Sequence, residues 1–175
     1  MLQKAQKQME DLPMEGRVKG FTEEEKQEKA PLLYNLAELQ AVAGKKYGYT
    51  AEQTLSFAQS LYEKHKVLSY PRTDSRALGM GMYGEIRLHL ESCRFEPYTA
   101  LIDKIPEENI VADKRYFNDN KVTDHHALLP TINNHMGEIY QKLTKEEKNI
   151  FDEVIRSFIA IFYPPYQYST STLIA

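Results

Sequence analysis

The stretch Leu68-Ser69-Tyr70-Pro71-Arg72-Thr73-Asp74-Ser75-Arg76 places a tyrosine hydroxyl among guanidinium groups, other hydroxyls and a carboxylate. A phenol, with a pKa of about 10, is a poor nucleophile at neutral pH unless nearby cations favour the phenolate and hold the group that it attacks. Arg72 and Arg76 are suited to that task because the planar fork of an arginine matches a phosphate. The stretch therefore suggests attack of Tyr70 on a phosphodiester. The alternative is a packed tyrosine that ends a short β run and is followed by a turn and a helix cap.

The composition is that of a soluble globular protein. The chain has 175 residues, of which 42% are hydrophobic and 27% are charged. No apolar run approaches the roughly 20 residues of a membrane span, so we expect no contact with a membrane. The single cysteine, Cys93, excludes an internal disulfide and a multi-cysteine zinc site. It fits a reducing, cytoplasmic location, which we expect for this protein.

The charge is distributed unevenly along the chain. The net charge of −3 argues against a protein that coats DNA over its whole surface. Between Lys45 and Arg76, however, six Lys and Arg stand against three Asp and Glu, a local balance of +3. This segment contains Tyr70, so we expect any contact with nucleic acid to be local to it. The acidic half that follows is also compatible with a protein-interaction domain.

Capping signals predict the elements before the tyrosine. Residues 1–30 are polar and charge-rich, and we expect an entering segment, helical at its start and with one short strand towards its end, that does not belong to the core. Asn35 is a suitable cap for a helix that stops at Gly44 or Gly48. Thr50 opens a second helix with a capping-box pattern.

The end of this second helix leads directly to the tyrosine. We expect Lys64, His65 and Lys66 in its last turn, where cations oppose the helix dipole. Residues 67–70 follow as a short strand. Two short helices and a strand are typical of a winged-helix or helix-turn-helix module. We therefore expect a domain over residues 31–163 that is mainly α with a small β component.

Further elements are predicted after the tyrosine: helices over residues 73–78, 85–92, 98–104 and 145–163, and an exit strand over residues 164–175. The last helix has the best apolar periodicity and stops at Pro164-Pro165.

The stretch from Gly79 to Gly84 has the spacing of a dinucleotide-binding loop. That loop needs a preceding hydrophobic strand, which is missing here, so the glycines indicate a flexible stretch instead.

A second constellation, Thr123-Asp124-His125-His126-Ala127-Leu128-Leu129-Pro130-Thr131, sets two adjacent histidines beside a carboxylate. Successive side chains on an extended segment point to opposite faces, so at most one of them faces a given site. A histidine there could hold a phosphate oxygen or pass a proton, because the ordinary pKa of an imidazole lies near 6.5. The alternative is a histidine bonded to its own loop. We expect no metal site, because no second His or Cys pair stands at ligand spacing.

Both stretches resemble motifs of the type IA DNA topoisomerases. The string Tyr-Pro-Arg-Thr-Asp-Ser-Arg at residues 70–76 is similar to the active-site motif of the topoisomerase III branch. The string Asp-His-His-Ala-Leu-Leu-Pro-Thr at residues 124–131 is similar to the second motif of the family, in the expected order. A weaker match before the tyrosine extends the resemblance over residues 31–168, with 1–30 and 164–175 as segments of the arch that links the domain to the rest of such enzymes.

The resemblance implies roles for individual residues. Tyr70 matches the nucleophile that becomes linked to a 5′-phosphate of single-stranded DNA, Arg72 the arginine that positions the scissile phosphate, and His125 the histidine that helps to bind it. The implied activity is that of an isomerase that cuts one DNA strand, lets another pass and reseals the first without ATP. The DNA contacts expected from this region are Gln59, Tyr62, Lys64, Thr73, Asp74 and Arg76.

The resemblance also implies partners outside these residues. The family builds its site between the tyrosine domain and an acidic Toprim domain, which supplies a glutamate, a lysine and Mg²⁺-binding aspartates. No Asp-x-Asp pair occurs in this chain. We therefore expect half of an active site, with Mg²⁺ held by a domain absent from this chain and with the isolated chain inactive.

The glycine-rich stretch departs from the family and predicts a less regular element after the motif. The rival hypothesis is a non-catalytic winged-helix module whose basic residues only grip phosphates.

Overall fold

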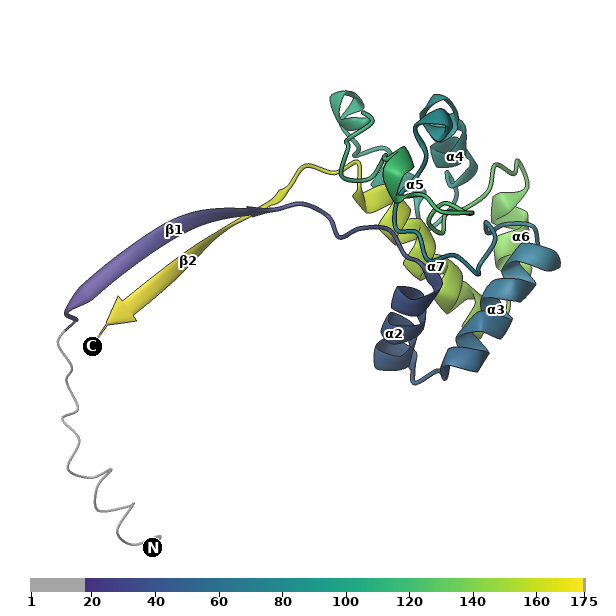
Figure 1. The fold of residues 1–175 in the computed structure, drawn as a ribbon, viewed down its shortest axis with the longest axis horizontal. Helices are drawn as coiled ribbons and strands as arrows, with labels where there is room; N and C mark the ends of the chain where they lie inside the picture. Colours follow the sequence, from purple (N-terminus) through teal and green to yellow (C-terminus); the bar gives the residue numbers. More distant parts are fainter. Residues whose placement is uncertain (1–17, 175) are drawn as a thin grey trace, which may run out of the picture. The chain divides into compact units, whose positions relative to one another are not determined.

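The structure, a computed structural model, describes residues 18–174, and the helix expected at the start of the entering segment lies outside these residues. The described chain forms two compact units. One is Lys29–Pro164 and the other consists of the strands near the two ends of the chain. Most of the regular elements are helices (Figure 1). The expectation of a mainly α protein with a small β component is confirmed.

The smaller unit is a two-stranded antiparallel ribbon. Strands β1 (Gly20–Glu28) and β2 (Tyr166–Ile174) pair along their whole length, with Gly20 opposite Ile174. β2 is rich in tyrosine and threonine, which favour strands. The strand expected at the end of the chain is therefore confirmed, and the strand expected late in the entering segment is also present.

The first predicted helix of the larger unit is present as α2 (Leu36–Tyr47). The Asn35 side chain accepts a hydrogen bond from the backbone N–H of Glu38 at 2.9 Å, which satisfies one of the free donors at the helix start. The helix ends at Gly48, whose φ of 73° lies in the left-handed region that glycine adopts without strain. Both caps agree with the sequence prediction.

The second predicted helix is α3 (Ala51–Glu63), and it opens with the expected capping box. Thr50 Oγ1 accepts the N–H of Gln53 at 3.1 Å, and the Gln53 side chain accepts the N–H of Thr50 at 2.9 Å. The helix ends before residues 64–66, so the expectation that these basic residues occupy its last turn is wrong. The chain leaves the helix through Lys66, whose φ is 57°.

The central helix of the larger unit is α7 (Lys145–Ala160), with α2 and α3 packed against it (Figure 1). It begins at the capping box of Thr144 and Glu147 and confirms the most regular of the sequence-predicted helices. Its buried apolar face supplies a large part of the core through Ile150, Phe151, Val154, Ile155, Phe158 and Ile159. Burial of such side chains is the main stabilising contribution to folding.

A buried carboxylate ties α2 to α7. Glu153 accepts hydrogen bonds from Lys46 Nζ at 2.9 Å, from the Tyr47 hydroxyl at 2.6 Å and from the Tyr34 hydroxyl at 3.3 Å. Burial alone would raise the pKa of Glu153, but these donors outweigh it and hold the pKa below its usual value. Burial and the neighbouring Glu153 raise the pKa of Tyr34 to about 12. The segment that precedes α2 is therefore fixed to the core.

Short helices complete the larger unit: a 3-10 helix at Met80–Glu85, α4 (Ile86–Ser92), α5 (Thr99–Ile102), 3-10 turns at Glu107–Asn109 and Asp119–Lys121, and α6 (Met136–Lys142). The glycine-rich stretch lies in the first of these. α6 was not predicted from the sequence. Within residues 18–174, each helix is too short or too polar to cross a membrane.

Two expectations around the tyrosine are wrong. The strand expected over residues 67–70 is reduced to a single antiparallel bridge between Leu68 and Pro130. The helix expected over residues 73–78 is absent, because this segment has no helical turn and ends in a bridge between Leu78 and Phe117. The winged-helix description is not confirmed. The two named strands of the described chain, β1 and β2, belong to the unit that does not contain α2 and α3.

Candidate active site

The two sequence motifs lie side by side because their backbones are hydrogen bonded to each other. The N–H of Ser69 donates to the carbonyl of Leu129 at 3.0 Å, and the N–H of Thr131 donates to the carbonyl of Val67 at 3.0 Å. The Ser69 hydroxyl accepts the N–H of Leu129 at 3.1 Å. These bonds flank the bridge of Leu68 with Pro130. They fix the segment before the tyrosine against the segment after the histidines.

Tyr70 lies between an imidazole and a second phenol. Its ring centroid is 4.6 Å from that of His125, with the planes tilted by 48°, and 5.4 Å from that of Tyr62, with an edge-on angle of 78°. The residue is 36% exposed. Among residues 18–174, no hydrogen bond engages the Tyr70 hydroxyl. The ring is held by its neighbours while one side of the residue stays open to solvent.

Arg72 stands at the apex of a tight turn directly after the tyrosine. The N–H of Thr73 donates to the carbonyl of Pro71 at 3.0 Å, which folds the chain back around Arg72. Pro71 and Thr73 are buried, whereas Arg72 is exposed. Within the described chain no carboxylate pairs with Arg72. A guanidinium without an acidic partner beside a tyrosine is available to an anion such as a phosphate.

Thr73 is a buried residue that connects the two motifs. It is only 4% exposed, and its hydroxyl donates to the carbonyl of His125 at 3.2 Å while accepting the N–H of Ser75 at 3.1 Å. We therefore propose a structural role for Thr73 in place of the expected contact with DNA. Asp74 is exposed, and its backbone carbonyl accepts a hydrogen bond from the Asn35 side chain at 3.0 Å. Its carboxylate makes no hydrogen bond within the described residues.

Arg76 is used within the protein. Its Nε donates to the carbonyl of Leu33 at 3.0 Å and its Nη2 to the carbonyl of Leu32 at 3.3 Å, while Nη1 lies 3.0 Å from the carboxylate of Glu38. The planar fork thus connects the loop after Tyr70 to the chain that leads into α2. The sequence did not predict this clamp, and we propose it as the role of Arg76 in place of the expected contact with DNA.

Asn35 completes the same connection and has two roles. Its Oδ1 caps α2, as expected from the sequence, and its Nδ2 holds the carbonyl of Asp74. The next backbone donor, the N–H of Leu36, bonds to the carbonyl of Thr73 at 3.1 Å. The cap was visible in the sequence, but its contact with the tyrosine loop joins residues far apart in the chain and carried no sequence signal.

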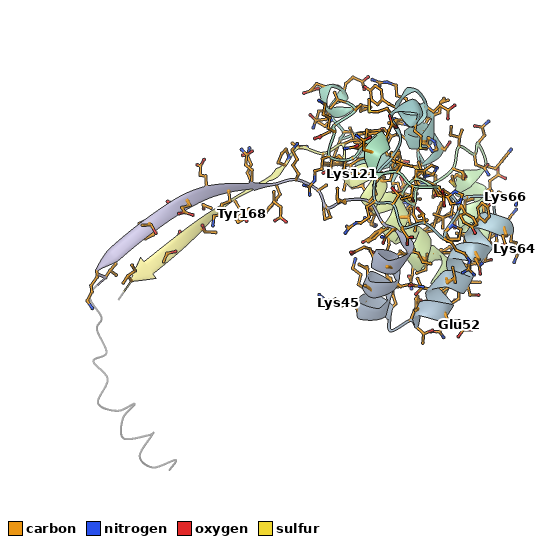
Figure 2. All side chains as sticks on the ribbon, viewed as in Figure 1. Lys45, Glu52, Lys64, Lys66, Lys121 and Tyr168 are labelled. Atoms are coloured by element: carbon orange, nitrogen blue, oxygen red, sulfur yellow. The ribbon has the colours of Figure 1, made fainter. Side chains whose placement is uncertain are left out.

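The residues expected from α3 are only partly brought to the tyrosine. Tyr62 contacts Tyr70, as described above. Gln59 lies one turn earlier on the same side of the helix, is half-buried, and makes no hydrogen bond with Tyr70 within residues 18–174. Lys64 is exposed at the C-terminal end of the helix, close to Lys66 (Figure 2).

The end of α3 is held by a buried carboxylate at the start of α7. Glu147 accepts a hydrogen bond from the Ser60 hydroxyl at 2.6 Å and lies 3.2 Å from His65 Nε2. Burial alone would raise the pKa of Glu147, but Ser60, the N–H of Thr144 and His65 together lower it. A charged Glu147 therefore fixes the helix end from which Tyr62 reaches Tyr70.

The two adjacent histidines point in different directions, as expected for an extended segment. His125 lies against Tyr70, whereas His126 Nδ1 is bonded to the carbonyl of the next residue at 2.7 Å. A third histidine, His89 of α4, supports the second motif but lies in neither of the two sequence motifs. It is buried and its Nδ1–H donates to the carbonyl of Pro130 at 2.7 Å. Burial lowers the pKa of His89, so it holds the second motif as a neutral imidazole.

Metal ligands do not converge in the described chain. Among residues 18–174, no group of three or more His, Cys, Asp or Glu side chains could hold a metal ion. The residues near Tyr70 therefore do not fit a Mg²⁺ site by themselves, because Mg²⁺ prefers a set of oxygen ligands with carboxylates.

Comparison with known proteins agrees with the two motifs. A model of the DNA topoisomerase family matches residues 1–175, which is the whole chain. The chain belongs to the DNA topoisomerase family. The resemblance to type IA enzymes of the topoisomerase III branch is confirmed by its relatives.

Two bacterial relatives illustrate the similarity of this topoisomerase chain. It is 41% identical to DNA topoisomerase 3 of Bacillus thuringiensis (strain Al Hakam) over 153 residues, which cover 86% of this chain and 20% of the relative. It is 38% identical to DNA topoisomerase 3 of Bacillus subtilis (strain 168) over 146 residues, which cover 83% of this chain and 20% of the relative. The chain thus spans about a fifth of the curated relatives that it matches.

A solved structure shares the fold. The full-length topoisomerase I from Thermotoga maritima, in a monoclinic crystal form, matches the topoisomerase chain with a TM-score of 0.65. The match covers 97% of this chain and 26% of the other, at 23% sequence identity. At this level of identity the comparison shows the fold alone.

Proposed function

We propose that this chain supplies the tyrosine half of a site that cleaves and rejoins one strand of DNA, as part of a DNA topoisomerase of the type IA class. The observation that carries the proposal is the position of Tyr70, held between His125 and Tyr62, with an arginine at the apex of the next turn that has no carboxylate partner among residues 18–174. A held phenol followed two residues later by an exposed arginine is suited to nucleophilic attack on an anionic phosphodiester.

The proposed reaction exchanges one phosphodiester for another. The Tyr70 oxygen forms a bond to phosphorus, and the bond from phosphorus to the 3′ oxygen of the preceding nucleotide breaks. The proton lost by the phenol balances the proton gained by the 3′ oxygen, which leaves with the electron pair of the broken bond. The downstream fragment of the strand stays attached to Tyr70 through its 5′-phosphate, and the upstream fragment leaves with a free 3′ hydroxyl. Because the bond type is conserved, rejoining needs no ATP.

Two further side chains assist this exchange. Arg72 binds the non-bridging oxygens of the phosphate, where negative charge is concentrated, as a planar donor fork does well. His125, whose ring centroid lies 4.6 Å from that of Tyr70, binds the same phosphate. Gln59, Tyr62, Lys64 and Asp74 remain proposed contacts with the strand. Thr73 and Arg76 instead hold the loop that carries the tyrosine.

The proposed partners are single-stranded DNA and an acidic Toprim-type domain. We leave Mg²⁺ to that domain, because the residues described for this chain form no carboxylate cluster. When bound there, Mg²⁺ would supply positive charge near the phosphate. We further propose that the chain alone is inactive and that the complete protein works in the cytoplasm.

The test is a comparison of full-length protein carrying Tyr70 with its Tyr70→Phe variant. Each is incubated with an end-labelled single-stranded oligonucleotide and Mg²⁺ and then run on a denaturing gel. We expect a covalent protein–DNA species only with Tyr70, at nearly equal DNA affinity, because the change removes a single hydroxyl. The same adduct in Tyr70→Phe would overturn the assignment. An adduct formed by residues 1–175 alone would overturn the proposed inactivity of the isolated chain.

A further inference from the structure

Lys66 adopts a backbone conformation that favours glycine. Its φ of 57° lies in the left-handed region, where a side chain is disfavoured by contact with the following carbonyl, and within residues 18–174 it is the only non-glycine residue with a positive φ. Glycine would close the end of α3 with less strain. The presence of a lysine at this position therefore needs an explanation other than the turn itself.

The surrounding contacts hold Lys66 in this conformation. Its carbonyl accepts a hydrogen bond from the Thr131 hydroxyl at 2.7 Å. The next N–H, that of Val67, bonds back to the carbonyl of Leu61 at 3.0 Å. Both bonds use the backbone of the turn, and glycine would allow them equally well. The Lys66 side chain is thus not required for the turn, although the turn fixes the position of the side chain.

The side chain points its charge towards the proposed site. Lys66 Nζ lies 5.6 Å from the centroid of the Tyr62 ring, and that ring meets Tyr70 edge-on. Figure 2 shows Lys66 at the C-terminal end of α3, well away from Lys45 of α2. Lys66 is exposed and, in the described chain, has no carboxylate partner. An exposed cation over an aromatic ring is held only weakly, so an anion can recruit it.

We propose that Lys66 binds a phosphate of the single-stranded DNA next to the phosphate that Tyr70 attacks, with the Tyr62 ring beneath it as a surface for the adjoining nucleotide. The left-handed backbone at Lys66 places the ammonium above this ring. The inference rests on the proposed function, since the strand is the one that Tyr70 cleaves. Lys66 contributes to binding and not to the chemical step, because its ammonium lies over the Tyr62 ring and, in the described chain, makes no hydrogen bond with Tyr70.

The test measures DNA affinity in the full-length protein that carries this chain, in a Tyr70→Phe background so that no cleavage occurs. A fluorescent single-stranded oligonucleotide is titrated at a series of salt concentrations. The slope of log affinity against log salt is negative, and the loss of one phosphate contact makes it shallower by about 0.7 for a single strand. We expect this change for Lys66→Gln. An unchanged slope would overturn the proposal.

A matched control is available at Lys148. Its Nζ lies 5.3 Å from the centroid of the Tyr140 ring, so it forms the same type of contact as Lys66. The Tyr140 ring packs against Phe95, Tyr98 and Phe151 instead of Tyr70. We expect Lys148→Gln to leave the slope unchanged. A change in slope as large as that of Lys66→Gln would mean that the effect comes from general charge and would overturn the proposed site.

A second variant separates binding from a structural role. Lys66→Gly removes the ammonium and also relieves the strain of the left-handed backbone at this position. We therefore expect a higher unfolding temperature, together with the same loss of DNA affinity as in Lys66→Gln. A lower unfolding temperature would show that the side chain supports the fold and would overturn the proposal. With Tyr70 restored, Lys66→Gln should need a higher DNA concentration than the parent to form half of its maximal adduct. An adduct without Tyr70 would instead overturn the proposed function, while the salt slope still decides the role of Lys66.

Discussion

Replacement of Arg76 by alanine should destabilise the protein without changing the number of DNA phosphates that the protein contacts. The guanidinium donates two hydrogen bonds to the carbonyls of Leu32 and Leu33 and pairs with Glu38. A hydrogen bond from a charged donor is worth about 1.5–3 kcal/mol, and an exposed ion pair about 0.5 kcal/mol. The Arg76 and Glu38 side chains are 31% and 46% exposed, so solvent reduces these values. We expect a total loss of about 2–3 kcal/mol in the free energy of unfolding.

Urea unfolding measures this loss, with Arg76→Lys and Glu38→Gln as companion variants. Lysine keeps the charge but cannot reach two carbonyls and a carboxylate with one ammonium, so we expect Arg76→Lys to recover less than half of the loss. Glu38→Gln removes only the ion pair and should cost about 0.5 kcal/mol.

The salt dependence of DNA binding decides between a clamp and a phosphate contact. We expect Arg76→Ala to leave the slope of log affinity against log salt unchanged in the full-length protein. If Arg76→Ala instead left the free energy of unfolding unchanged and made the salt slope shallower by about 0.7, Arg76 would be a phosphate contact. That result would refute the clamp.

Three further predictions address the site and its support. Arg72→Ala should slow cleavage by about 100- to 1,000-fold, the usual effect of losing one donor to a transition state, as measured by the rate of adduct formation at saturating DNA; an unchanged rate would exclude that role. His125→Ala should impair cleavage more than His126→Ala, since only His125 contacts Tyr70, and the reverse order would assign the role to the wrong histidine. Burial, only partly offset by Arg156, raises the pKa of Asp152 to about 6, so its ionisation should destabilise the fold as pH rises from about 4 through 6. Asp152→Asn should then be more stable than the parent at pH 8, by at most about 3 kcal/mol, and equal stability at pH 8 would contradict that burial effect.

The helix ends were predictable because their signals are local. Asn35, Thr50 and Thr144 each cap a helix through a backbone donor within three residues, so the sequence alone contains the whole interaction. The end of α3 was misjudged because the left-handed turn at Lys66 is held by Thr131, which is distant in the chain. A lysine near a helix end looks the same in sequence whether it is inside or beyond the last turn.

The loop after the tyrosine could not be predicted because its partners are remote. Residues 73–78 carry cap-forming side chains, which favoured a helix in the sequence. Their backbone groups bond instead to Leu36, Ala127 and Tyr116 in other parts of the unit. Tertiary contacts therefore override the local preference. The side chain of Arg76 shows the same limit, since its chemistry suits a phosphate but its partners are carbonyls.

The proximity of the two motifs was a prediction from resemblance, and the structure supplies a physical reason for it. The backbone bonds of Ser69 and Thr131 bring His125 to the Tyr70 ring. The supporting residues Asn35, His89 and Glu147 had no such motif, because each acts through contacts with a segment elsewhere in the chain.

The most direct test of the central claim is to locate the covalent bond. The adduct of the full-length protein with single-stranded DNA is digested with nuclease and trypsin and analysed by mass spectrometry. Cleavage after Lys66 and Arg72 releases the peptide of residues 67–72, in which Tyr70 is the only tyrosine. We expect a nucleotide attached through its 5′-phosphate to Tyr70 of this peptide. A nucleotide on any other residue, or one attached through a 3′-phosphate, would contradict the proposed function.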